Sequence, residues 1–221
     1  MSMSYLTLIV VTMVIGLGAT TYVNGQIKKY NRVRCSVGLT GAQACRQMLD
    51  YYGLHNVPIK QGSSGQDFFD PRSNSITLDP TAFSTASITS MATACHEVGH
   101  AVQYAQGYTP MKVRGAIVPV VNFCSNAWVF VLLLGIFMQM AGLVNLAIAL
   151  YAGVVIFQLV TLPVEFNASN RAMEYMRTTG MAEAELKGSY SVLRACALTY
   201  VAAALISVLQ LLYLLGQGER N

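Results

Sequence analysis

Long apolar stretches alternate with polar segments along this 221-residue chain. A helix that crosses a bilayer needs about 20 predominantly apolar residues, and four stretches meet that requirement. The predicted membrane spans are residues 5–23, 116–138, 143–162 and 195–215. The middle two come from one uncharged stretch between Gly115 and Val164, which is too long for one crossing and suits two.

The polar segments between these spans carry two patterns typical of strands. An alternating run at Ser75–Leu78 predicts one strand. Val57–Lys60 predicts a short edge strand, because its proline cannot donate to a hydrogen-bond ladder. An edge strand can pair with an extended peptide, and Ile76–Leu78 is the predicted place for a substrate backbone.

Three helices are also predicted in the polar segments. Leu39–Ala42 opens a helical pattern that stops at Gly53. A second helix covers residues 87–106 and is again followed by a glycine. A third helix is predicted to begin at Pro163 and to run to about Arg177, because proline is favoured in the first turn of a helix.

Composition strengthens the membrane interpretation. The chain is 54% hydrophobic and 11% charged, with a mean hydropathy of +0.46, whereas soluble domains are about 25% charged. Its five cysteines show neither C-x-x-C nor framework spacing, which indicates reduced, packed thiols. The net charge of +4 could suggest a nucleic-acid partner, but the positions of the charges do not. The sequence contains no basic helix and no interleaving of aromatic and basic residues, so no nucleic-acid partner is predicted.

The positions of the charges predict the orientation in the membrane. Four basic residues follow the first span: Lys28, Lys29, Arg32 and Arg34. Positive charge after an apolar run favours a cytoplasmic flank and an N-terminus outside, whereas a cleaved signal peptide, the alternative, carries positive charge before it. With residues 24–115 and 163–194 in the cytoplasm, 13 of the 14 Lys and Arg residues lie inside and Arg220 lies outside.

The motif His96-Glu97-Val98-Gly99-His100 carries the candidate chemistry. Histidines four apart on a helix are separated by about 40° around its axis, so both imidazoles can reach one metal ion. Glu97 is offset from His96 by about 100° and can reach a water on that metal without being a ligand. The alternative is a pair of satisfied surface histidines, but a chance motif is improbable in a chain with three histidines. The pattern predicts a catalytic zinc site with Glu97 as general base.

A third protein ligand is needed, and Glu165 is the favoured candidate. It is predicted at the cytoplasmic mouth of a membrane span, on the same side of the membrane as the histidines. Two histidines and a glutamate from a second helix form a known hydrolase site. His55, Glu174, Asp70 and Asp79 remain alternatives as third ligand. The alternative role for Glu165 is that of an interfacial residue that caps a helix dipole.

Several sequence blocks together resemble one family in both content and order. These blocks are Leu39–Ala42, Asp70–Arg72, His96–Gln103, Val118–Asn122, Leu162–Phe166 and Asn167–Ala172. The chain resembles the YugP-like membrane zinc metallopeptidases of bacteria over residues 38–204 and the leading span.

The resemblance implies zinc bound by His96 and His100, with Glu97 catalytic and Glu165 as the remaining ligand. Asn167 stands where relatives commonly carry aspartate. It can still accept a hydrogen bond, and together with Ser169 it is a candidate to orient a ligand histidine.

The sequence therefore predicts a mainly α integral membrane protein with about four transmembrane helices and a small α+β, zincin-like cytoplasmic subdomain. Residues 1–221 form a single integrated domain, a zinc-dependent endopeptidase of the bacterial cell membrane whose active site faces the cytoplasm. Glu97 activates the nucleophilic water, Arg171 and Tyr200 are candidates to stabilise the oxyanion, and the partners are peptide or membrane-protein substrates and the lipid bilayer. The alternatives are a non-catalytic zinc-binding scaffold or adaptor and, less favoured because no internal repeat is found, a small transporter.

Overall fold

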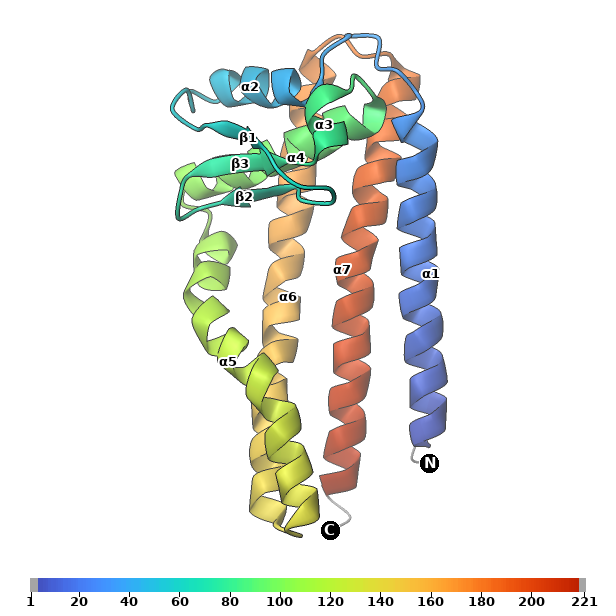
Figure 1. Cartoon of the computed structure of the whole chain (residues 1–221), viewed down its shortest axis with the longest axis vertical. Helices are drawn as coiled ribbons and strands as arrows, with labels where there is room; N and C mark the ends of the chain where they lie inside the picture. Colours follow the sequence, from blue (N-terminus) through green and yellow to red (C-terminus); the bar gives the residue numbers. More distant parts are fainter. Residues whose placement is uncertain (1–3, 219–221) are drawn as a thin grey trace. The chain divides into compact units, whose positions relative to one another are not determined.

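The computed structural model describes residues 4–218, so Arg220 lies outside the described residues. Figure 1 labels the helices and strands along the chain. In chain order they are α1 (Tyr5–Asn31), α2 (Gly41–Tyr51), β1 (Ile59–Gln61), β2 (Phe68–Asp70), β3 (Ser75–Leu78), α3 (Pro80–Ser84), α4 (Ile88–Ala105), α5 (Thr109–Phe137), α6 (Ala141–Thr178) and α7 (Glu183–Gly218). The protein is mainly α, as predicted, with a small three-stranded sheet.

Helices α1, α5, α6 and α7 are each long and apolar enough to cross a membrane. Their number agrees with the four predicted spans, but the helices extend beyond the apolar runs. The prediction of a new helix at Pro163 is wrong, because α6 continues through this residue to Thr178. An internal proline is tolerated in membrane helices where neighbouring groups satisfy the freed backbone, and Pro119 lies inside α5 in the same way.

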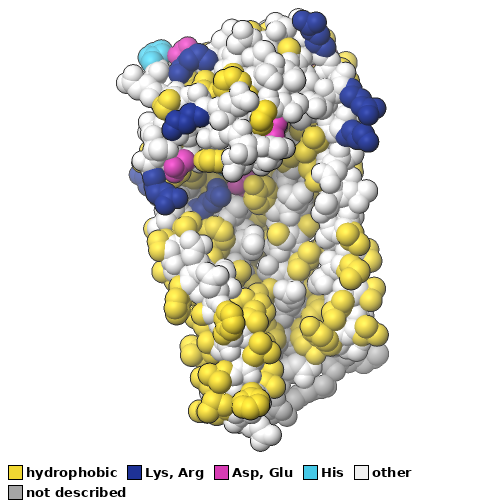
Figure 2. All heavy atoms as spheres, viewed as in Figure 1, with side chains coloured by type: hydrophobic (Ala, Val, Ile, Leu, Met, Phe, Trp, Pro, Cys, Tyr) yellow, Lys and Arg dark blue, Asp and Glu magenta, His cyan; other side chains and the backbone are white. Residues whose placement is uncertain are grey.

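Contacts divide the chain into two compact units. The apolar unit comprises the residues up to Thr20, Lys112–Pro163 and the residues from Thr199, and the polar unit comprises Thr21–Met111 and Val164–Leu198. On the apolar unit, large side chains such as Phe130 and Phe137 are exposed. Figure 2 shows hydrophobic side chains gathered over the apolar helices. An exposed apolar surface of this kind suits contact with lipid.

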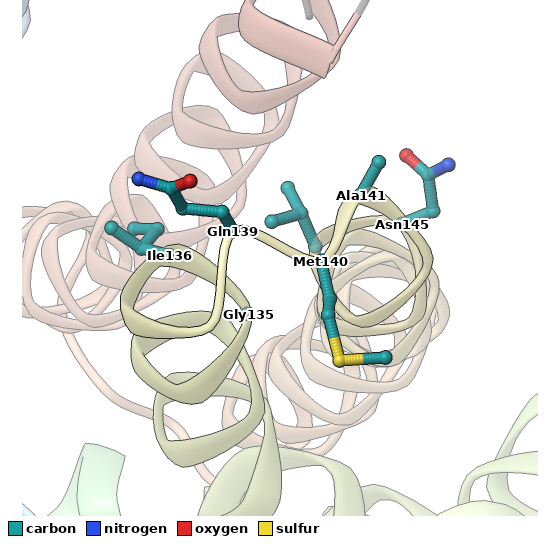
Figure 3. A pocket seen from close by; sticks show the side chains of 7 residues that line it. Gly135, Ile136, Gln139, Met140, Ala141 and Asn145 are labelled. Carbon is teal, nitrogen blue, oxygen red and sulfur yellow. The ribbon is translucent and has the colours of Figure 1, made fainter.

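One polar pair in the apolar unit joins two helices. The Tyr151 hydroxyl on α6 donates a hydrogen bond to the Gln210 side chain on α7, and the Trp128 ring of α5 lies 4.5 Å from the Tyr151 ring, centroid to centroid. A cavity of about 400 Å³ lies at the turn between α5 and α6, and the seven residues that line it include Gln139 and Asn145 (Figure 3). None of the seven is acidic, basic, His or Cys, so this cavity lacks a titratable side chain for acid–base chemistry.

The polar unit contains the sheet, in which the strand order is β1-β3-β2. β1 runs parallel to β3 with Ile59 opposite Ile76, and β2 runs antiparallel to β3 with Phe69 also opposite Ile76. The prediction of an edge strand at Ile76–Leu78 is therefore wrong, because β3 is hydrogen-bonded on both sides. β1 lies at one edge, as its preceding Pro58 predicts, and β2 forms the other edge.

Side-chain caps fix the ends of the helices in the polar unit. Thr40 and Gln43 form a capping box at the start of α2, and the helix ends before Gly53, whose φ of +73° suits glycine. The Ser87 hydroxyl caps α4 by accepting a hydrogen bond from Ser90 N at 3.0 Å. The observed span of α4 confirms the helix predicted at residues 87–106.

Helix α4 lies at the centre of the polar unit's core. It packs against α2, α3, β2 and β3, and Met91, Val98 and Val102 are buried along it. Helix α2 also lies close to α3, since a Cβ at Gly41 would lie 2.0 Å from the carbonyl oxygen of Ala82 on α3. Because α4 is enclosed along most of its length, the directions of its polar side chains are set by packing.

Candidate metal centre

Two histidines on α4 and one glutamate on α6 converge within the polar unit. His96 Nε2 lies 3.3 Å from Glu165 Oε2, and His100 Nε2 lies 3.6 Å from the same oxygen. One potential ligand atom from each of the three residues lies within 4.8 Å of the others. His100 and Glu165 are buried and His96 is partly buried. The structure thus brings together the three residues that the sequence predicts as metal ligands.

The separations of these atoms fit the geometry of zinc. Ligand atoms about 2.0–2.1 Å from a tetrahedral zinc ion lie roughly 3.3–3.5 Å from one another. The two distances from Glu165 Oε2, 3.3 and 3.6 Å, agree with this spacing. Two imidazoles and a carboxylate also form a donor set that zinc accepts, and three protein ligands leave the fourth position open for water or substrate.

The close approach of α4 to α6 depends on Gly99. A Cβ at this position would lie 2.5 Å from the carbonyl oxygen of Ala168 and 3.0 Å from its Cα. Glycine therefore lets the backbones of the two helices pack directly against each other. Because Gly99 precedes His100 and Ala168 lies three residues after Glu165, this contact lets the carboxylate reach the imidazoles.

Each histidine is also held through its second ring nitrogen. His96 Nδ1 lies 3.2 Å from the Ser169 hydroxyl, and His100 Nδ1 lies 3.0 Å from Gln103 Oε1. Ser169 was one of the two predicted candidates for this role. The other, Asn167, contacts Gln103 instead of a histidine, with its Oδ1 accepting from Gln103 Nε2 at 2.9 Å.

Gln103 lies outside the residues that the motif predicts to act at the metal. Its position three residues after His100 was the available signal, since side chains at this spacing share one face of a helix. In the structure Gln103 is fully buried and also donates to the Val164 carbonyl at 2.7 Å. It therefore connects α4 to α6 beside Glu165.

Glu97 differs from Glu165 in the surroundings of its carboxylate. Its residue is 7% exposed, and no described residue forms a hydrogen bond or ion pair with it. A buried carboxylate usually has such partners, since leaving its charge unpaired costs free energy. An unpaired carboxylate next to His96 is available to interact with a water or a substrate.

Negative charge surrounds the two imidazoles. Burial lowers the pKa of His100, but the hydrogen bond to Glu165 and the charges of Glu97 and Glu165 raise it more, so this pKa lies above its ordinary value. Burial raises the pKa of Asp67 to about 6, and the charge of Glu97 adds to that rise. An excess of acidic groups favours a bound cation here.

The alternative third ligands lie outside this cluster, which is the one group of three potential ligands found among residues 4–218. His55 Nδ1 pairs with Asp50 at 2.9 Å in an exposed turn. Asp70 accepts hydrogen bonds from Arg72 N and the Ser73 hydroxyl in the turn between β2 and β3. Asp79 caps the N-terminus of α3, and Glu174 is an exposed residue of α6.

The two predicted oxyanion candidates have different surroundings. Arg171 donates from Nε to Asn167 Oδ1 and from Nη1 to Gln106 Oε1, both at 2.8 Å. Through Asn167, the Arg171 guanidinium is thus linked to Gln103, which in turn contacts His100 Nδ1. Tyr200 belongs to the apolar unit, and its predicted role stays a prediction.

Comparison with known proteins gives two matches over nearly the whole chain. Residues 5–218 match the family described as "Putative neutral zinc metallopeptidase". The chain is 38% identical over 212 residues to "Putative membrane protease YugP" of Bacillus subtilis (strain 168), and the alignment covers 95% of this chain and 94% of that protein. No solved structure matches the chain.

Proposed function

The chain belongs to the family of neutral zinc metallopeptidases, and we propose that it is a membrane-embedded, zinc-dependent endopeptidase. In this proposal His96, His100 and Glu165 hold the zinc ion and Glu97 is the catalytic base. The observation that carries the proposal is the convergence of two ring nitrogens of α4 on one carboxylate oxygen of α6. The unpaired carboxylate of Glu97 on the same helix completes the set.

Zinc, when bound, supplies a Lewis acid that polarises a peptide carbonyl and lowers the pKa of water to about 7. The chain's own residues then handle the proton. Glu97 accepts it from the attacking water at its carboxylate and returns it to the nitrogen of the leaving amine. Because no residue in the described part of the chain pairs with this carboxylate, Glu97 is free to take up the proton without first breaking a contact.

The substrate in this proposal is an extended peptide segment that pairs with β2. This strand is an edge of the sheet and packs against α4, the helix that carries the zinc-binding motif. An added strand makes main-chain hydrogen bonds that do not depend on the peptide's sequence. Peptides and unfolded segments of membrane proteins both present such an extended backbone. We therefore propose that substrates bind through a zincin-like arrangement, in which an edge strand lies beside the helix that carries the metal ligands.

The membrane location follows from the four apolar helices, and the orientation is part of the proposal. We place the polar unit in the cytoplasm of a bacterial cell, because 13 of the 14 Lys and Arg residues lie in its two segments or next to them. The chain is proposed to act as one integrated domain. Helices α1, α6 and α7 each contribute residues to both units, so neither unit is made of an uninterrupted piece of chain.

A Glu97→Gln variant tests the proposed function, with Glu174→Gln, an exposed position of α6, as the matched control. Both proteins are purified in lipid nanodiscs, and zinc content and cleavage of unfolded casein are measured. The proposal predicts that Glu97→Gln keeps one zinc per chain and loses cleavage by about 10²–10⁴-fold, while the control behaves as wild type. Unchanged cleavage by Glu97→Gln would refute the proposal. Zinc binding without any cleavage by wild type would favour a scaffold or adaptor.

A further inference from the structure

Gln103 has every polar position of its side chain engaged in a fully buried place. Its Oε1 lies 3.0 Å from His100 Nδ1. Its Nε2 donates one hydrogen to the Val164 carbonyl at 2.7 Å and the other to Asn167 Oδ1 at 2.9 Å. The carboxamide therefore bridges a metal-ligand histidine on α4 to two groups on α6.

The partners on α6 determine which way the carboxamide faces. The Val164 carbonyl can only accept, so the Gln103 atom beside it must be the NH₂ group. Arg171 can only donate, so the Asn167 atom beside its Nε must be Oδ1, which then accepts from Gln103 as well. Both constraints leave the Gln103 oxygen facing His100.

The same network sets the tautomer of the histidine. Because Gln103 presents an acceptor, His100 Nδ1 must carry a hydrogen, and the lone pair of the neutral ring is then on Nε2. That nitrogen is the atom 3.6 Å from Glu165 Oε2. The ring is thereby presented with its coordinating nitrogen toward the proposed zinc position.

We propose that Gln103 is a positioning residue of the metal centre, which fixes the orientation and tautomer of His100 by transmitting the constraints of Val164 and Arg171 to the ring. This inference rests on the proposed zinc site and adds a part of it that the HExxH motif does not contain. Asn167 acts in it as an acceptor only, since both of its hydrogen bonds here use Oδ1. Aspartate at position 167 can keep both bonds, whereas leucine can keep neither.

Zinc affinity, measured on the full chain by competition with a chromophoric chelator, tests the inference without any substrate. Gln103→Leu should weaken zinc binding about 10–100-fold, the usual cost of removing a group that orients a ligand histidine. Gln47→Leu, at an exposed position of α2, is the matched control and should bind as wild type. Asn167→Leu should weaken binding in the same direction, and Asn167→Asp should bind at least as tightly as wild type. These two variants keep the test informative if Gln103→Leu does not fold.

A thermodynamic cycle separates positioning from general support of the fold. If Gln103 acts through His100, Gln103→Leu should lower the residual zinc affinity of a His96→Ala protein but not that of a His100→Ala protein. In ¹⁵N spectra of the wild type, the His100 ring should be protonated at Nδ1. Equal zinc affinity of Gln103→Leu and wild type, or equal losses in the two histidine backgrounds, would overturn the inference. A wild-type chain that binds no zinc would refute the proposed function itself.

Discussion

Gly99→Ala adds one methyl group at the point where α4 and α6 are closest. The new Cβ would lie 2.5 Å from the Ala168 carbonyl oxygen, whereas ordinary contact begins at 3.4 Å. The atoms it meets are backbone atoms of α6, which cannot rotate away as a flexible side chain would. The two helices must therefore separate by about 0.9 Å near the metal centre.

This displacement has a small effect on folding and a large one on metal binding. Overpacking costs about 1–3 kcal/mol, and alanine recovers about 1 kcal/mol of it through its higher helix propensity than glycine. A metal site, in contrast, tolerates errors of only about 0.2 Å in its ligand distances. Moving Glu165 away from His96 and His100 should weaken zinc binding by more than the roughly 10–100-fold cost of losing an orienting partner.

Chelator competition and thermal unfolding of the metal-free protein measure the two effects separately. Gly25→Ala is the control, because this helical glycine of α1 has no atom within 4 Å of its added Cβ. We expect Gly25→Ala to keep wild-type zinc affinity and to be slightly more stable. Wild-type zinc affinity in Gly99→Ala would show that the contact with Ala168 does not set the position of Glu165, and would refute this reasoning.

Three further predictions concern single residues. Ser169→Ala should weaken zinc binding about tenfold, because His96 Nδ1 loses its hydrogen-bond acceptor. The control variant Ser191→Ala on α7 should bind zinc as wild type does. Equal zinc affinities of the two variants in chelator competition would contradict this prediction. Partial burial raises the pKa of the Asp67 carboxyl to about 6, so the folded state holds the carboxyl proton more tightly than the unfolded state. The free energy of unfolding should therefore decrease by about 2 kcal/mol as the pH rises from about 4 through about 6. Unfolding curves of an Asp67→Asn protein should lack this part of the pH dependence. Glu165→Gln should fold, bind zinc far more weakly and lose cleavage, and retention of full zinc content would exclude Glu165 as a ligand.

Local sequence patterns were enough to predict much of the protein. The apolar runs predicted four membrane-capable helices, since span length depends only on bilayer thickness and helix rise. The spacing of His96 and His100 predicted that both rings face one point, because helix geometry fixes directions within one element. The placement of Glu165 came from its position at the end of an apolar run, and the structure brings its carboxylate to that point.

Other features that depend on tertiary contacts were missed or predicted wrongly. Pro163 suggested a helix start, yet α6 continues through it, because local propensity does not show which neighbours support the backbone. The run at Ile76–Leu78 has the pattern of a strand, but its pattern does not say whether one or both edges are paired. The role of Gln103 depends on groups from α6, which are more than sixty positions away along the chain.

Anomalous diffraction at the zinc edge, collected on crystals of the full chain, tests the central claim most directly. The account predicts one peak about 2.1 Å from His96 Nε2, His100 Nε2 and a carboxylate oxygen of Glu165. A crystal grown with zinc that shows no peak there, or whose strongest peak lies at His55 or another group, would contradict it.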